Sequence, residues 1–378
     1  MKCNGFDLSR GELVEISFGQ TIQSVEPALA PRPGESEVFV APGWIDLQVN
    51  GFGGVDYNSP HATVPEIAAS IDKQFATGTT RFFPTVITGA PDRMQAALRN
   101  LAEAKATLPA IEGLHLEGPY ICPQDGPRGA HPGEWVRPPD WDEFRRFQDA
   151  AYGHIRLVTL SPEWPGCTDL IERLVGLGVV VSIGHTAANS QQIADSVSAG
   201  ATLSTHLGNG AHPTLPKFPN YLWDQLAEDR LAASFIVDGI HLPPAFLRVA
   251  LRAKGLEQSL LVTDAVAPAG CRPGPYHLGE VAVELHPDQS VRLRGGTRLA
   301  GSALRMDQAI SNCIRTAGLS LRDAVVLATR NPARVGRVAG RQRGLNPGER
   351  ADLVRFRFQN GVFQILETFV DGALVYSY

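Results

Sequence analysis

The sequence has few cysteines, and they follow no recognisable spacing. There are five in 378 residues, with no CxxC pair among them: Cys3, Cys122, Cys167, Cys271 and Cys313. An odd number of widely scattered thiols indicates neither a disulfide framework nor a thiolate zinc site. The pattern is typical of a protein from a reducing compartment.

Long apolar runs and an excess of one charge are also missing. No stretch of about 18 apolar residues is available for a membrane span, and the N-terminal MKCNGFDLSRGELVE has no apolar segment of signal-peptide length. The formal net charge of -5 gives no basic footprint for nucleic acid. These absences predict a cytoplasmic protein with a small-molecule substrate and neither a nucleic-acid nor a membrane partner.

Short apolar runs alternate with longer helical patterns between Gly43 and about Arg330, which is typical of repeated βα units. Eight runs are predicted strands: 43–50, 80–86, 111–117, 154–160, 179–185, 201–206, 232–238 and 259–264. Helical patterns between them include 64–77, 91–107, 167–177 and 189–199. The last has Asn189 as a cap and Gly200 beyond its end. Eight parallel strands close a (β/α)8 barrel.

The two chain ends have a different pattern, with short polar and apolar alternations typical of strands. The tail includes an Asn-Gly hairpin signal at Asn360 and Gly361. We therefore predict an α/β fold, a TIM-like barrel over 43–339 with a small β-sandwich domain formed by 1–42 and 340–378.

Four polar residues end predicted strands three, five, six and eight: Glu117, His185, His206 and Asp264. One strand-end histidine alone is commonly a satisfied structural residue. As a set, however, these residues would meet at the carboxyl end of the barrel, where such enzymes build their sites. A carboxylate and two imidazoles give a metal three ligands and leave one position for water, while Asp264 is placed to move protons.

Several segments extend this pattern: APGWIDLQVNGFGGVD, GLHLEGPY, SIGHTAA, STHLGNGAHP, DGIH, LVTDA and LAGSAL. In their order they resemble the N-acetylglucosamine-6-phosphate deacetylases of the amidohydrolase superfamily over nearly the whole chain. The resemblance implies that Glu117, His185 and His206 hold the metal and that Asp264 is the catalytic acid and base. It also implies that His131 is catalytic, contacting the substrate and polarising the acetyl carbonyl.

The resemblance further implies a set of substrate contacts: Ala130, His131, Asn209, Gly210, Lys217, His241, Leu299, Ala300 and Gly301. Many relatives have a His-x-His pair at the end of strand one, where this chain has Gln48 and Asn50. Amides are poor transition-metal ligands. We therefore expect one divalent ion per subunit, with these two amides either orienting water and the groups around the metal or filling polar space in the barrel.

A second departure concerns the phosphate. The family usually has Asn-Ala-Met and then an arginine after the second metal histidine, whereas GNGAHPTLPKFPN offers Lys217 as its only cation. Lysine binds phosphate as a point charge without the fork of arginine.

The resemblance implies N-acetylglucosamine-6-phosphate as the first candidate substrate. A different or unphosphorylated N-acetylhexosamine, another small N-acyl compound and a catalytically silent sugar-binding role stay open. The ligand set suits zinc first, and iron, cobalt or manganese as well. The resemblance also implies a homodimer.

Overall fold

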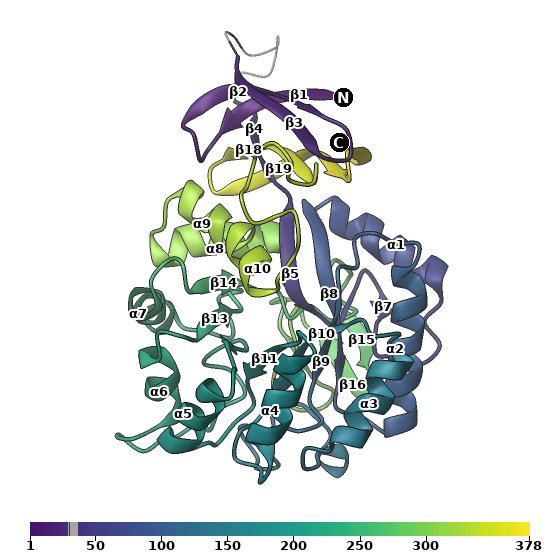
Figure 1. Cartoon of the computed structure of the whole chain (residues 1–378), viewed down its shortest axis with the longest axis vertical. Helices are drawn as coiled ribbons and strands as arrows, with labels where there is room; N and C mark the ends of the chain where they lie inside the picture. The colour runs from purple at the N-terminus through teal and green to yellow at the C-terminus, as the bar shows by residue number, and fades with distance from the viewer. Residues whose placement is uncertain (29, 31–36) are drawn as a thin grey trace.

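The computed structural model describes residues 1–28, 30 and 37–378, and its largest sheet is an eight-stranded parallel barrel sheet (Figure 1). Its strands, in order, are β5 (Trp44–Val49), β8 (Thr79–Ile87), β9 (Leu114–Glu117), β10 (Ile155–Leu160), β11 (Val180–Ile183), β12 (Leu203–Ser204), β13 (Ala232–Phe235) and β14 (Ser259–Leu261). Each overlaps one predicted run, so the barrel prediction is confirmed.

The first and last strands are joined near their carboxyl ends. The Asp264 amide donates to the carbonyl of Gln48 at 3.0 Å, and Val49 forms a parallel bridge with Ala265. The barrel is therefore nearly closed, and these contacts join strands one and eight beside the predicted site.

Helices cover the outside of the barrel: α1 (Val64–Phe75), α2 (Pro91–Lys105), α3 (Trp141–Ala150), α4 (Cys167–Gly176), α5 (Ser190–Ser198), α6 (Tyr221–Ala227), α7 (Pro244–Lys254), α8 (Met306–Ala317), α9 (Leu321–Leu327) and α10 (Arg330–Val335). Their apolar faces are buried, as Ile67, Ile71 and Phe75 of α1 illustrate. The side chain of Asn189 accepts from the Gln192 amide in a capping box, which confirms the predicted start of α5.

The chain ends form one seven-stranded sheet, in the order β20-β19-β18-β4-β1-β2-β3. Its strands are β1 (Lys2–Asp7), β2 (Glu12–Phe18), β3 (Ile22–Pro27), β4 (Phe39–Pro42), β18 (Leu353–Gln359), β19 (Val362–Val370) and β20 (Ala373–Ser377). Strand β4 pairs with both β1 and β18, so it joins the two ends as predicted. Asn360 and Gly361 have φ of 52° and 77° in the predicted hairpin turn. The domain boundaries themselves stay a prediction.

A three-stranded antiparallel sheet between β14 and α8 was not predicted. It consists of β15 (Gly274–Leu278), β16 (Val281–Leu285) and β17 (Val291–Leu293). Its apolar residues, including Leu278 and Val283, pack against Ile87 and Val266 beside the barrel mouth. Its strands are short and half exposed, so the alternating pattern that predicts a strand is weak.

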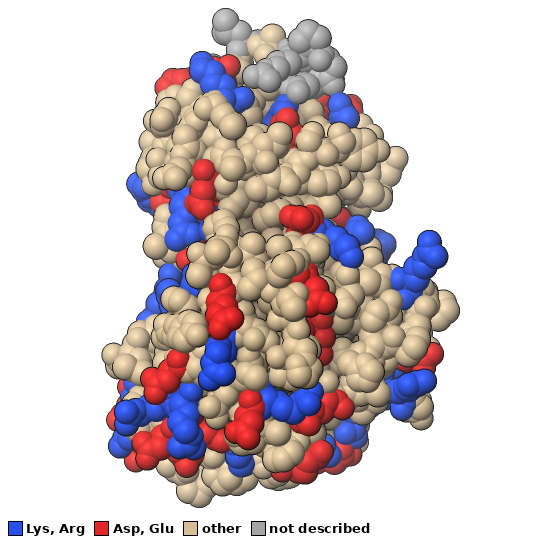
Figure 2. Space-filling model, turned by 90° about the vertical axis from the view of Figure 1, so that its right-hand side faces the viewer, with Lys and Arg blue, Asp and Glu red and all other residues tan. Residues whose placement is uncertain are grey.

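The distribution of charged side chains does not indicate a particular class of binding partner. On the face shown in Figure 2, acidic and basic side chains are interspersed over the lower part of the barrel. Among the described residues, no helix is long and apolar enough to cross a membrane.

A buried ion-pair network joins the barrel to the small sheet. Asp352, just before β18, accepts hydrogen bonds from Arg81 of β8 at 2.8 and 2.9 Å and from Arg341 at 2.5 Å. Burial alone would raise the pKa of Asp352, but the two guanidinium groups hold it at about 2. The carboxylate is therefore ionised, and the two parts of the molecule share its charge.

We predict that Asp352→Asn lowers the free energy of unfolding by about 3–5 kcal/mol, because it removes the counter-charge of buried Arg341 and one of the two carboxylates that pair with buried Arg81. Urea denaturation measures the effect. Asp142→Asn is the matched control, since that exposed carboxylate lies 3.8 Å from exposed Arg145 and its loss should change little. Equal stability of Asp352→Asn and the native protein would contradict the prediction.

Candidate metal centre and active site

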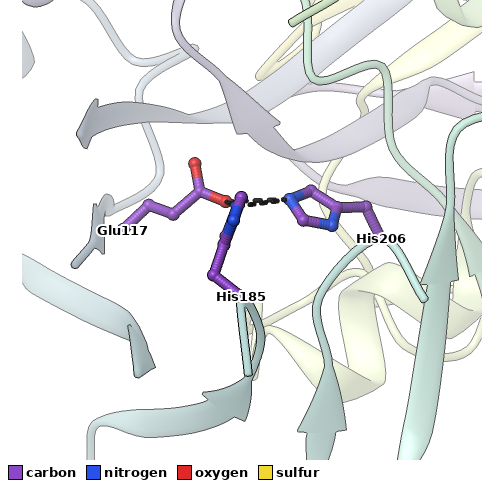
Figure 3. Close-up of side chains that lie close together, drawn as sticks. All are labelled: Glu117, His185 and His206. Carbon is purple, nitrogen blue, oxygen red and sulfur yellow. Dashed lines mark hydrogen bonds and ion pairs between the residues drawn. The ribbon is translucent and has the colours of Figure 1, made fainter. Parts of the chain in front are cut away.

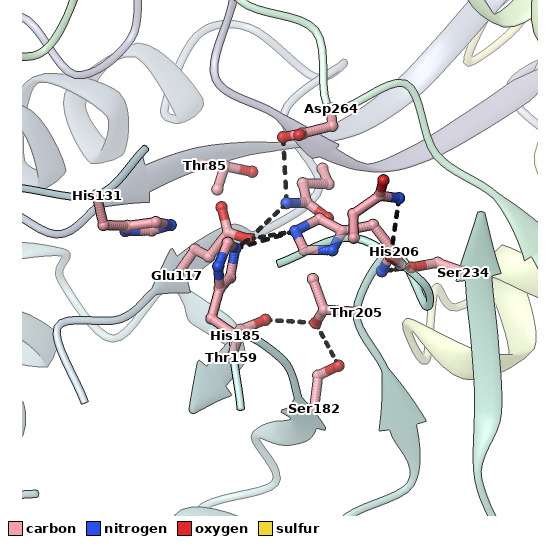
Figure 4. Close-up of polar contacts among 12 residues, drawn as sticks. Thr85, Glu117, His131, Thr159, Ser182, His185, Thr205, His206, Ser234 and Asp264 are labelled. Atoms are coloured by element: carbon pink, nitrogen blue, oxygen red, sulfur yellow. Dashed lines mark hydrogen bonds and ion pairs between the residues drawn. The ribbon is translucent and has the colours of Figure 1, made fainter. Parts of the chain in front are cut away.

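The four predicted residues lie together at the carboxyl ends of the strands. Glu117 ends β9, His185 and His206 follow β11 and β12, and Asp264 follows β14. All four side chains are buried. Figure 3 shows Glu117, His185 and His206 converging from three strands, and Figure 4 places Asp264 beside them.

Three of the four residues have a backbone conformation that is uncommon for side chains other than glycine. His185, His206 and Asp264 have φ of 51°, 30° and 51°. Such residues cost on the order of 1 kcal/mol each and persist where the surroundings fix them. Here the His206 amide donates to Ser234 Oγ at 2.8 Å, and the Asp264 amide is held by β5. The strand ends turn in a way that brings the side chains together.

The three candidate ligand atoms are close enough to share one ion. Glu117 Oε1 lies 3.3 Å from His185 Nε2 and 3.0 Å from His206 Nε2, and the two nitrogens are 3.1 Å apart. His185 Nδ1 lies 2.8 Å from the Pro127 carbonyl. Because a carbonyl oxygen only accepts, Nδ1 carries the proton and Nε2 turns a lone pair towards the carboxylate. A lone pair facing a carboxylate oxygen is an arrangement that a cation stabilises.

The charge state of Glu117 also suits a metal. Burial would raise its pKa, but the imidazoles of His185 and His206, both close to its Oε1, lower it well below the ordinary value. An ionised carboxylate and two imidazoles therefore fit a divalent ion with one open position, as in catalytic zinc sites.

Gln48 and Asn50 face the carboxylates. Gln48 Nε2 donates to Glu117 Oε1 at 2.8 Å and to Asp264 Oδ1 at 3.2 Å, and Asn50 Nδ2 donates to the same Asp264 oxygen at 2.7 Å. An amide nitrogen that donates these bonds has no lone pair for a metal. The geometry supports a role in orienting the groups around one metal.

Asp264 is the second acid of the site whose pKa is shifted. Burial, and then the negative charge of Glu117, raise its pKa to about 8. A cation held by Glu117 would oppose the second cause. A carboxyl group that titrates near neutral pH is suited both to accept and to donate a proton.

His131 lies against this group from the loop that follows β9. Burial lowers its pKa to about 3, so the imidazole is neutral at pH 7. Its Nδ1 is 2.9 Å from the Thr88 hydroxyl, and its ring centroid is 4.4 Å from that of His185. If Thr88 donates to Nδ1, the ring N–H is at Nε2. Thr88 was not among the predicted residues, although it directly follows β8 as the other site residues follow their strands.

Two glycines let backbone approach the His185 ring. A Cβ at Gly210, which has φ of 55°, would lie 2.6 Å from His185 Nδ1. One at Gly129, with φ of 59°, would lie 3.1 Å from Cε1. Gly210 therefore has a packing role against a candidate ligand in addition to its place in the cavity wall.

The site opens into a cavity of about 470 Å³. Its walls include Asn50 and most of the predicted substrate contacts: Ala130, His131, Asn209, Gly210, His241, Leu299 and Gly301. Two predicted contacts are not in the walls. Ala300 is buried, and Lys217 is exposed, with its Nζ 5.8 Å from the ring of Phe218. Two charged lining residues were missed, Asp125 and Arg298.

Comparison with known proteins shows the family of the chain. The model of the amidohydrolase family matches residues 39–375. The chain belongs to this family. It is 32% identical to N-acetylglucosamine-6-phosphate deacetylase of Bacillus subtilis over 90% of this chain and 86% of that protein. It is 34% identical to N-acetylgalactosamine-6-phosphate deacetylase of a Shewanella species, over 96% of this chain and 91% of that protein.

A solved structure from Mycobacterium smegmatis is also similar. It is a mutant N-acetyl-D-glucosamine-6-phosphate deacetylase in complex with N-acetyl-D-glucosamine-6-phosphate. It superposes with a TM-score of 0.87 at 31% identity, over 97% of this chain and 94% of that chain. The resemblance found in the sequence motifs is therefore confirmed, both for the family and for the fold.

We predict that Gly210→Ala weakens metal binding by about 10- to 100-fold, because the new methyl group displaces the His185 imidazole. Competition with a chromogenic chelator measures the affinity. Gly153→Ala is the control, since that glycine also has positive φ, at 78°, but an added Cβ would meet nothing within 4 Å. Equal metal affinity in the two variants would contradict the packing role.

Proposed function

We propose that this protein is a metal-dependent deacetylase of N-acetyl amino-sugar phosphates, with N-acetylglucosamine-6-phosphate as the first candidate substrate. The products are acetate and glucosamine-6-phosphate. The observation that carries the proposal is the convergence of Glu117, His185, His206 and Asp264 at the base of one cavity. The names of the similar proteins support the choice of substrate class.

The residues of the chain transfer the protons and stabilise the negative charge that develops on the acetyl oxygen. A divalent ion held by the triad of Glu117, His185 and His206 would lower the pKa of a bound water and polarise the acetyl carbonyl. Asp264 takes a proton from the attacking water and gives it to the amide nitrogen as the C–N bond breaks. Gln48 and Asn50 both donate to Asp264 Oδ1, so we assign the transfer to Oδ2. The Nε2–H of His131 donates to the carbonyl oxygen as it becomes negative.

Zinc is the proposed metal, at one ion per subunit, because a carboxylate and two imidazoles match its catalytic sites. Iron, cobalt and manganese accept the same ligands. Cytoplasmic location and the homodimer stay predictions.

N-acetylgalactosamine-6-phosphate is the second candidate substrate, favoured by the Shewanella relative of that name. An unphosphorylated sugar or another small N-acyl compound would use the same acyl chemistry. A silent sugar-binding role fits less well, because the cavity brings together a complete set of metal ligands and a proton-transfer group.

The test is acetate release by zinc-reconstituted protein from both N-acetylhexosamine-6-phosphates and from the two unphosphorylated sugars. We expect turnover of a phosphorylated sugar, and a loss of about 10²- to 10⁴-fold in kcat for Asp264→Asn because general acid and base catalysis is removed. Metal content, measured by inductively coupled plasma mass spectrometry, should be retained in the variant. Near-normal turnover of Asp264→Asn would overturn the role given to this residue, and no acetate from any of the sugars would overturn the proposed function.

A further inference from the structure

The cavity wall contains one arginine, Arg298, that has no role in the proposed mechanism. Among the described residues that line the cavity, Arg298 is the only lysine or arginine. Its side chain is 39% exposed, so the guanidinium group is accessible to a ligand. It belongs to the segment between β17 and α8, three residues before Gly301.

This segment contacts the backbone of Asp264. A Cβ at Gly301 would lie 3.1 Å from the backbone oxygen of Asp264, and the Ser302 amide donates to that oxygen at 2.9 Å. Three residues of fully extended chain span at most about 11 Å. The Arg298 backbone is therefore within that distance of Gly301, and its long side chain can meet the far end of a sugar whose acetamide lies at Asp264.

The present partners of Arg298 are weak and exposed. Its Nη2 lies 2.6 Å from Asp125 Oδ1, and its Nη1 donates to the Gly129 carbonyl at 3.1 Å. The Asp125 side chain is 70% exposed, and Arg128 lies 3.4 Å from the same oxygen. Solvent-exposed ion pairs contribute little net stability. Asp125 therefore orients the guanidinium group without binding it tightly. If an anionic ligand displaced Asp125 from Arg298, Asp125 would still have Arg128 as a partner.

We propose that Arg298 is the residue that recognises the phosphate of the substrate, with the phosphate replacing Asp125 as its partner. The proposal rests on the proposed function, and it replaces Lys217 as the cation for this group. A phosphate carries more negative charge than a carboxylate and has three acceptor oxygens. A guanidinium group meets it with two parallel N–H donors, which a lysine cannot do.

A rival role for Arg298 is purely structural. Both partners belong to the loop that contains Ala130 and His131, so Arg298 could serve only to fasten that loop over the site. The two roles differ in which substrates they affect. A fastening role changes turnover of every acetylated sugar, whereas phosphate recognition changes only that of phosphorylated sugars.

The experiment compares kcat/KM for N-acetylglucosamine-6-phosphate and N-acetylglucosamine in the zinc-loaded protein, or the galactosamine pair if that pair is preferred. Arg298→Ala should lose about 10- to 150-fold on the phosphorylated sugar, the range expected for hydrogen bonds to charged groups, and change little on the other. Arg298→Lys should recover part of the loss. Arg294→Ala, an exposed arginine of the same segment that does not line the cavity, is the matched control and should match the native protein on both sugars.

Three outcomes would overturn the proposal. Equal losses on both sugars would assign Arg298 to loop fastening. A phosphate-specific loss in Lys217→Ala instead of Arg298→Ala would return the phosphate to the lysine. A native protein that gains nothing from the phosphate would leave the deacetylase proposal standing while rejecting phosphate recognition.

If the native protein releases no acetate from any sugar, the proposed function fails but binding still tests Arg298. Calorimetry with glucosamine-6-phosphate and glucosamine then replaces turnover. Weaker binding of only the phosphorylated sugar by Arg298→Ala would support phosphate recognition, and unchanged binding would reject it.

Discussion

The candidate active site depends on one buried carboxylate oxygen, Oε1 of Glu117. Three nitrogen atoms converge on it: Gln48 Nε2 at 2.8 Å, His206 Nε2 at 3.0 Å and His185 Nε2 at 3.3 Å. These side chains come from the first, third, fifth and sixth strands of the barrel sheet. The contacts can form together only when the parallel strands have the correct register, because a shift by one residue turns each side chain to the opposite face.

The same oxygen links the electrostatics of the site. The negative charge of Glu117 contributes to the raised pKa of Asp264, while the imidazoles keep Glu117 itself ionised. Gln48 donates to both carboxylates and so keeps them near one another without a second positive ion. One cation at the imidazoles would then be enough to balance the cluster. This explains in physical terms why an amide pair in place of His-x-His is compatible with a single metal.

The sequence predicts the features of the fold and site that are local to one strand, cap or turn. The eight runs, the cap at Asn189 and the hairpin at Asn360 and Gly361 follow from periodicity and turn chemistry. The four strand-end residues follow from the rule that parallel strands present their carboxyl ends at one face of a barrel.

Features that depend on the path of a loop have no such local signature in the sequence. Lys217 is near the second histidine in sequence, but its segment leads it to the exposed surface, whereas Arg298 reaches the cavity from a distant segment. Asp352 and Arg81 are 271 residues apart, so their ion pair has no sequence signature. The sheet of β15, β16 and β17 is half exposed, which weakens the alternation that would reveal it.

The most direct test of the account is a crystal structure of the zinc-loaded protein with diffraction data on both sides of the zinc absorption edge. We predict one anomalous peak per subunit, within bonding distance of Glu117, His185 Nε2 and His206 Nε2, and none beside Gln48 and Asn50. A second peak between the amides and Asp264 would contradict the single-metal site. A peak elsewhere, with none at the triad, would contradict the assignment of the ligands.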